Sequence, residues 1–359
     1  MTRGRSWLRS FAACLTGVGL VACADVEASD PLGGEGRPIS AEPVPFGAGG
    51  LTPALSVPPS GAESIALFVR GEPGTCFALA SLEDARGRDC ADCALRTSIA
   101  QGEALFVLPR AGEFDPGEGL TLRFGAMRCE TLTPLEAAAH HLELAWRPRG
   151  APPSRGRLSL RFLVSAHSML FGDPELQRAL AEQLNRELDG AGLEVIVEEV
   201  AELAGVPSEA RFASTELREL AAMLEHAPRP AVYPSVDVVF AGCLRYDDPF
   251  FGPPMAVDGF TPRVGGGAGP ADAVFMPGLR CDGFGGGPAR YPLESYAHVL
   301  AHELGHFLGL HHTLEPDGTA DLLADTSEEN AMHHNPSLAS SRGWSPSQGE
   351  RIRSHPWVR

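Results

Sequence analysis

The sequence predicts a small all-β, sandwich-like domain followed by an α+β domain in which helices back a twisted mixed sheet. Short apolar runs separated by Gly, Pro and Asp succeed one another from Glu63 to Arg147, which is typical of a β-sandwich. Three prolines between Pro148 and Arg155 indicate a domain boundary, and beyond it strand-like and helix-like runs alternate. With 359 residues, 43% of them hydrophobic, the chain is long enough to build two cores.

Residues 1–22 are predicted to be a signal peptide. Arginines precede the apolar run Phe11–Ala22, which is too short to span a bilayer. The sequence Leu-Val-Ala-Cys at its end resembles the lipobox of bacterial lipoproteins and predicts that Cys23 is lipidated; the alternative is cleavage after Ala24 and a secreted product. Residues 23–60, rich in Gly, Pro, Ala and Ser, are predicted to form a flexible tether. We therefore expect an exported protein at the bacterial cell envelope or surface, held to the membrane by a lipid anchor only.

The charge of the chain argues against one class of partner. The formal net charge is −17, and all 29 basic residues are arginines that form no basic patch. Such an acidic balance argues against binding to nucleic acid or to anionic membrane surfaces.

Residues 61–148 are predicted to form the all-β domain, because short apolar runs are spaced by turn residues. No catalytic pattern stands out in it. The sequence leaves open whether this domain is a pro-domain, a substrate-binding module or a spacer. The predicted strands are Ile65–Val69, Cys76–Ala80, Ala104–Leu108, Leu120–Ala126 and Leu142–Trp146.

The α+β domain is predicted to span residues 156–359. Because helices separate its strands, some of these strands can lie parallel. A longer helix begins near Pro292 and carries apolar residues at three- and four-residue spacing. The other predicted elements are strand Leu158–Val164, helix Asp173–Leu188, strand Leu193–Val197, helix Ser214–Glu225, strand Val236–Ala241 and a short helix within Ser345–Ser354.

Six cysteines beyond the leader are predicted to form disulfides, because an exported protein with an even count normally pairs them. Four fall before residue 130 and two lie between residues 240 and 285, so each domain is expected to close its own bridges. Two of the first four form a C-x-x-C pair, for which a redox or zinc role is the alternative. The six are Cys76, Cys90, Cys93, Cys129, Cys243 and Cys281.

The strongest functional pattern is H-E-x-x-H-x-x-G-x-x-H, which runs from His302 to His312. On a helix, residues four apart lie on one face, so His302 and His306 can bind one zinc ion. Gly309 can adopt the left-handed conformation that ends a helix, which brings His312 back as a third ligand. Three histidines leave a fourth position open for water, as in catalytic zinc sites, and Glu303 is placed to act as general base.

This extended motif resembles that of the metzincin zinc metallopeptidases, and loosely that of their pappalysin-like bacterial members, in which a Met-turn follows the histidines. Met332, in the turn-rich stretch Glu329–Pro336, is the matching methionine and is expected to form the floor of the site. Some relatives carry a tyrosine two residues after the methionine, where this chain has His334. That position implies either assistance at the oxyanion or a turn histidine that faces solvent.

The same resemblance implies a sheet strand that pairs with extended substrate. The segment containing Ala273, Val274 and Phe275 is the best match, and an ordinary buried strand is the alternative. Acidic residues between Glu315 and Glu329 suggest either a Ca2+ site or a solvated loop.

The predicted function is that of a zinc-dependent endopeptidase with one catalytic Zn2+ ion, acting on extracellular or surface proteins or peptides. Two alternatives remain. One is a non-catalytic surface or adhesive lipoprotein that retains the metzincin fold, and the other is a zinc hydrolase that acts on non-peptide substrates.

Overall fold

The computed structural model describes the chain from Arg37 onward, with gaps, so the predicted signal peptide and Cys23 lie outside the described residues. None of the helices within the described ranges has the length and apolarity needed to cross a lipid bilayer. The described residues are 37–38, 44–62, 64–71, 75–89, 103–109, 113–128, 133–135, 141–149, 153–213, 217–225, 227–228, 235–247, 253–262, 264, 273–281, 290–315, 320–321, 323–327, 330–336, 343–355 and 357–359.

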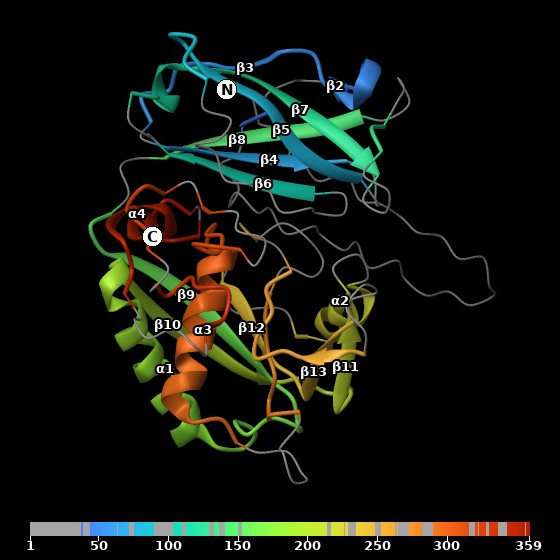
Figure 1. The fold of residues 1–359 in the computed structure, drawn as a ribbon, viewed down its shortest axis with the longest axis vertical. Helices are drawn as coiled ribbons and strands as arrows, with labels where there is room; N and C mark the ends of the chain where they lie inside the picture. The colour runs from blue at the N-terminus through green and yellow to red at the C-terminus, as the bar shows by residue number, and fades with distance from the viewer. Residues whose placement is uncertain are drawn as a thin grey trace, which may run out of the picture.

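The strands before residue 150 pair antiparallel in two sheets (Figure 1). One sheet has the order β1-β8-β4-β6, with β2 also pairing with β8, and the other has the order β3-β7-β5. Phe106 and Phe124, one from each sheet, meet edge to face with ring centroids 5.2 Å apart, so the two sheets share one core. The elements are β1 (Arg37–Pro38), β2 (Val44–Pro45), η1 (Ala48–Gly50), β3 (Leu55–Val57), β4 (Ser64–Arg70), β5 (Thr75–Asp84), β6 (Glu103–Pro109), η2 (Pro116–Glu118), β7 (Leu120–Arg128) and β8 (His141–Arg149).

The second part of the chain is built on a four-stranded sheet of order β10-β9-β12-β15, in which every strand pair is parallel. Strand β9 is buried on both faces, as a central parallel strand should be: Phe162 joins one core cluster and Leu163 the other. A small sheet of order β11-β13-β14 lies beside α2. The elements are β9 (Gly156–Val164), α1 (Pro174–Leu188), η3 (Asp189–Ala191), β10 (Leu193–Glu202), β11 (Glu209–Phe212), α2 (Arg218–Glu225), β12 (Val236–Phe240), β13 (Cys243–Tyr246), β14 (Met255–Ala256), β15 (Val274–Met276), α3 (Leu293–Phe307) and α4 (Pro346–Arg353).

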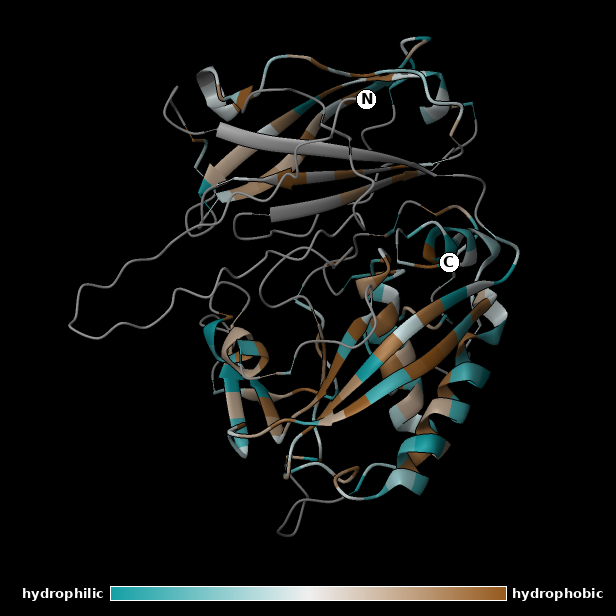
Figure 2. Cartoon of the chain, turned by 180° about the vertical axis from the view of Figure 1, so that it is seen from behind, coloured by the Kyte–Doolittle hydropathy of each residue, from teal (hydrophilic) through white to brown (hydrophobic). Residues whose placement is uncertain are grey.

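Helices α1 and α3 pack against each other and join one core cluster with the sheet (Figure 1). α1 begins as predicted, because Asp173 Oδ1 accepts a hydrogen bond from Leu176 N at 3.0 Å and Pro174 occupies the first turn. Leu180 and Leu184 are fully buried, whereas Figure 2 shows hydrophilic residues along the outer side of α1. α1 is thus an amphipathic support for α3.

The structure confirms a mixed α/β architecture, but the described strand pairs of the four-stranded sheet are all parallel, whereas the sequence predicts a mixed sheet. The strand predicted to end at Val197 continues to Glu202, because a bulge between Val197 and Glu199 extends its pairing with β9. The sequence does not predict β11, β13 or β14, which have four residues or fewer and therefore show no periodicity. The predicted C-terminal helix is α4.

Candidate metal centre

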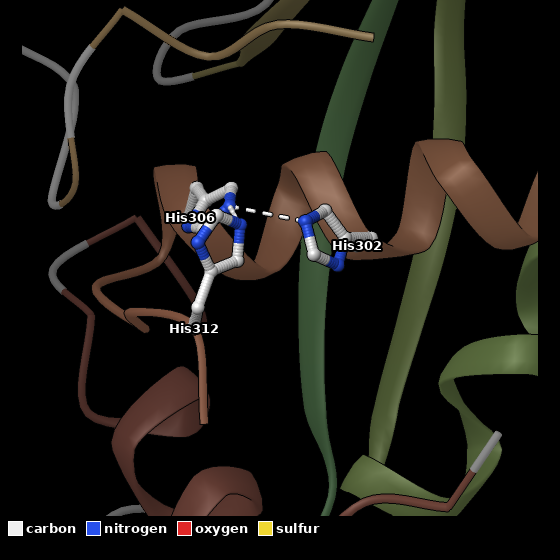
Figure 3. Close-up of side chains that lie close together, drawn as sticks. All are labelled: His302, His306 and His312. Carbon is white, nitrogen blue, oxygen red and sulfur yellow. Dashed lines mark hydrogen bonds between the residues drawn. The ribbon is translucent and has the colours of Figure 1, made fainter. Parts of the chain in front are cut away.

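Three histidine side chains converge at the end of α3 (Figure 3). His302 and His306 lie four residues apart on the helix, so their rings share one face. The helix ends at Phe307, and Gly309, with a φ of 102°, turns the chain so that His312 reaches the same point. The Nε2 atom of His306 lies 3.1 Å from that of His302 and 3.2 Å from that of His312.

The other ring nitrogens of the two helical histidines bond to carbonyl groups. His302 Nδ1 lies 2.8 Å from Ala331 O, and His306 Nδ1 lies 2.8 Å from Leu310 O. Because a carbonyl oxygen only accepts, each Nδ1 carries the proton and each Nε2 is left with a bare lone pair. Lone pairs that face one another at 3.1 Å repel, and a cation between them removes the repulsion.

The spacing of these nitrogens fits zinc. Zinc–imidazole bonds of about 2.0–2.1 Å at tetrahedral angles put ligand nitrogens about 3.4 Å apart, close to the separations between the Nε2 atoms. The third ring is oriented by a carboxylate, since His312 Nδ1 lies 2.8 Å from Glu315 Oε2. Within the described part of the chain, His302, His306 and His312 form the only group of three or more side chains whose ligand atoms lie close enough to share a metal ion.

Burial keeps the three imidazoles neutral. It is the main cause that lowers the pKa of His302 well below its usual range, that of His306 to about 3 and that of His312 to about 4. Neighbouring imidazoles lower all three further. Neutral imidazole is the form that binds a metal ion, so the fold holds the three side chains in their ligand form at neutral pH.

Glu303 follows the first histidine on α3, and its side chain is buried. Burial raises the pKa of its carboxyl to about 7, and hydrogen bonds from Thr261 act in the opposite direction. The Thr261 hydroxyl also donates to the main-chain oxygen of Glu303 at 2.9 Å. A carboxyl whose pKa lies near 7 can both take up and release a proton at neutral pH.

The segment Asp258–Thr261 packs against Glu303 and is here called the base-facing segment, because Glu303 is the predicted general base. A Cβ atom built on Gly259 would lie 2.7 Å from Glu303 Cγ, 2.9 Å from Glu303 Oε1 and 3.0 Å from Val299 Cγ1. Any side chain at this position would therefore clash with the side chain of Glu303. The segment begins with an anchor, because Tyr291 Oη donates to Asp258 Oδ1 at 3.1 Å.

The structure shows how the predicted substrate-pairing strand is paired, and its role stays a prediction. Ala273, Val274 and Phe275 are fully buried, and β15 lies at one end of the parallel sheet. Phe275 is already paired on its outer side: Phe260 N donates to Phe275 O at 2.8 Å, and Phe275 N donates to Phe260 O at 2.9 Å. The base-facing segment thus occupies the outer main-chain groups of Phe275, which an extended substrate would need in order to pair with β15.

Met332 lies in a buried turn against α3. A Cβ atom built on Gly305 would lie 2.5 Å from Met332 Sδ, so the glycine between the two helical histidines makes room for this side chain. The main-chain oxygen of Met332 accepts from Thr313 N at 3.0 Å, which ties the turn to the residue after the third histidine.

His334 is exposed and lies beside the cluster. Its ring centroid is 6.4 Å from that of His312, and it stacks on His333 at 4.3 Å. Its Nδ1 atom lies 3.2 Å from Leu314 O. The oxyanion role of His334 stays a prediction.

Two carboxylates of the acidic loop bond to the chain itself. Asp321 Oδ1 accepts from Thr326 Oγ1 at 2.7 Å and from Leu323 N at 3.2 Å. Asp325 Oδ1 accepts from Ser345 Oγ at 2.9 Å. These bonds give both side chains a structural role, and a Ca2+ site in this loop stays a prediction.

Cys243 and Cys281 form a disulfide with an S–S distance of 2.04 Å, as predicted, and the loop that it closes contains the base-facing segment. Cys76 is also disulfide-bonded, and its partner is not among the described residues. The remaining predicted cysteines, Cys23, Cys90, Cys93 and Cys129, lie outside the described residues.

Sequence reasoning missed several residues that contact Glu303 or support the Met332 turn. Gly305 could have been noticed in the sequence, because a glycine inside a helix lowers helix stability by about 1 kcal/mol relative to alanine and so indicates close packing. Gly259, Thr261 and Asn330 carried none, since only the tertiary fold brings them near α3.

A family model matches the part of the chain that contains the three histidines. Residues 290–356 match the model of the peptidase family M43, described as Pregnancy-associated plasma protein-A. A solved structure, the archaemetzincin of Methanopyrus kandleri, is similar to this chain with 18% sequence identity, over 56% of this chain and 88% of that chain, at a TM-score of 0.28. No curated protein matches the chain. The family match covers α3, the three histidines and the Met332 turn, and it supports a zinc peptidase.

Proposed function

We propose that the protein is a metzincin-type zinc endopeptidase that hydrolyses peptide bonds of extracellular or surface proteins. The observation that carries the proposal is the convergence of three neutral imidazole Nε2 atoms beside a buried carboxyl, that of Glu303. His302, His306 and His312 would hold the ion. A bound zinc ion supplies Lewis acidity, which lowers the pKa of a water molecule and polarises a carbonyl group.

Glu303 performs the proton transfers in this proposal. Its carboxylate takes a proton from the attacking water and later gives it to the leaving nitrogen of the cleaved bond. A pKa of about 7 suits both steps, because a group transfers protons best when its pKa lies near the working pH. Thr261 hydrogen-bonds to the Glu303 carboxyl, and Gly259 lets the base-facing segment lie directly against the Glu303 side chain.

The test is the substitution Glu303→Gln. The amide has the same shape but cannot accept the proton, so hydrolysis of a quenched peptide library should fall by about 100-fold or more while zinc stays bound. Glu294→Gln, which changes an exposed glutamate on the same helix, is the matched control and should leave turnover intact. Unchanged turnover in zinc-loaded Glu303→Gln protein would refute the mechanism. Absence of any chelator-sensitive cleavage by the wild type would favour a binding protein instead.

We also propose export with a lipid on Cys23, on the evidence of the leader sequence alone. Expressed in a bacterial host, the protein should partition into the detergent phase of a membrane extract, and Cys23→Ser should move it to the aqueous phase. Wild-type protein recovered in the aqueous phase with Asp25 at its N-terminus would support ordinary signal cleavage.

A further inference from the structure

The orientation of one candidate ligand depends on a turn that is distant in sequence. His302 Nδ1 donates to the carbonyl oxygen of Ala331 at 2.8 Å, and both residues are buried. This bond fixes the ring orientation and the tautomer that leaves Nε2 facing the cluster. Whatever holds Ala331 in place therefore also holds His302 in its ligand geometry.

The Ala331 turn is held by a reciprocal pair of side-chain amides. Asn330 Oδ1 accepts from Met332 N at 2.9 Å, which closes the turn around Ala331. The same Oδ1 accepts from Gln348 Nε2 at 2.9 Å, and Asn330 Nδ2 donates to Gln348 Oε1 at 3.0 Å. The two amides thus fix one another in position and orientation.

The pair is isolated from water. Asn330 is 4% exposed and Gln348 is fully buried. Burial of two amides is costly unless they are hydrogen-bonded, so each depends on the other. A buried pair of this kind restricts the turn to one conformation, because any shift leaves polar groups without partners.

Gln348 belongs to a rigid element. It lies in the first turn of α4, where it forms a capping box with Ser345: Gln348 N donates to Ser345 Oγ at 3.2 Å, and Ser345 N donates to Gln348 Oε1 at 3.0 Å. Further along α4, Ile352 is fully buried in the core that α3 also contacts. The turn that contains Ala331 is therefore fixed in position relative to the C-terminal helix, α4.

We propose that Gln348 is a positioning residue for His302, acting through Asn330 and the carbonyl of Ala331. Gln348 touches no reacting group. Without it, the turn loses its side-chain link to α4 and keeps only main-chain bonds, such as those from Ala331 N to Gly343 O and from Thr313 N to Met332 O. The Ala331 carbonyl is then freer to move relative to the ring, and His302 is less well oriented to bind a metal ion. The proposal rests on the zinc site proposed above. Groups that orient a metal ligand in this way typically change metal affinity by about 10- to 100-fold when removed.

The experiment measures the zinc dissociation constant of the full chain by competition with a chromogenic chelator. Gln348→Met keeps the length of the side chain but removes its hydrogen bonds, and it should weaken zinc binding by about 10- to 100-fold. The matched control is Ile352→Val on the same helix, which removes one buried methyl group without touching the amide pair. This control should lower the melting temperature of the zinc-free protein and leave the zinc dissociation constant within about twofold of wild type.

A second variant covers the case in which Gln348→Met fails to fold. Asn330→Ser keeps an oxygen that can accept from Met332 N, but its side chain is too short to reach Gln348. It should weaken zinc binding in the same direction. Zinc affinity unchanged in both variants, with only the melting temperature lowered, would overturn the positioning role and leave the zinc site intact. A wild-type chain that binds no zinc would overturn the zinc site itself.

Discussion

The close contact between the base-facing segment and Glu303 predicts how a substitution at Gly259 will affect catalysis. In the substitution Gly259→Ala, the new methyl carbon would lie 2.7 Å from Glu303 Cγ and 3.0 Å from Val299 Cγ1. Ordinary contacts between carbon atoms are about 3.5–4.0 Å, so the Glu303 arm must move by about 1 Å or the segment must yield. The hydrogen bonds between Phe260 and Phe275 hold the segment to the sheet, and we therefore expect the side chain to move.

A displacement of about 1 Å at a catalytic group can cost about 100-fold in rate, which corresponds to about 2.7 kcal/mol of transition-state stabilisation. We expect kcat of Gly259→Ala to fall by about that factor, while KM changes little and zinc content stays stoichiometric. The assay is steady-state cleavage of a quenched peptide, with zinc measured by elemental analysis.

The matched control is Gly125→Ala, since a Cβ atom there would meet its nearest neighbours at 3.7 and 4.0 Å, which is ordinary contact. This control should retain wild-type kcat. If Gly259→Ala lowers kcat by less than about threefold, the segment does not fix Glu303 and the reasoning is wrong. Loss of zinc from this variant would instead mean that the methyl group disturbs the neighbouring histidine.

Three further predictions follow from the cluster. Glu315→Gln should weaken zinc binding by about tenfold in chelator competition, because His312 Nδ1 loses its anionic partner; unchanged affinity would contradict this orienting role. The zinc-free protein should lose stability as pH falls from about 6.5 toward 4, because burial depresses the pKa of His302, His306 and His312 and the unfolded chain binds more protons there; these three shifts outweigh the raised pKa of Glu303, which acts in the opposite direction. Urea unfolding across that range checks this, and a flat profile would contradict it. His334→Ala should lower kcat by less than threefold, since the side chain is exposed; a drop of about a hundredfold would establish the oxyanion role instead.

The cluster itself could be predicted because its geometry is encoded locally. His302, His306 and His312 lie within eleven residues, and helix periodicity plus one glycine determines how they meet. The start of α1 at Asp173 was predictable for the same reason, since a capping residue and a proline act on their immediate neighbours.

The surroundings of the cluster could not be predicted, because they depend on tertiary contacts. Phe260 pairs with Phe275 through a single bridge, which leaves no alternating pattern in the sequence, so this pairing could not be predicted. Gln348 shows only the capping pattern of α4, and its bond to Asn330 appears only when both segments are folded. The orientation of ligands and base is thus a property of the whole domain.

The Cys243–Cys281 bridge adds a covalent restraint to the non-covalent contacts that hold the base-facing segment. It joins the two ends of the loop that contains the base-facing segment, across a sequence separation of 38 residues. In a reducing compartment the loop ends are joined only by non-covalent contacts, and the segment is free to sample more conformations. Once the bridge has formed, Gly259 and Thr261 are confined near Glu303. Disulfide formation therefore narrows the range of conformations open to the segment beside Glu303, and this narrowing occurs only where thiols are oxidised.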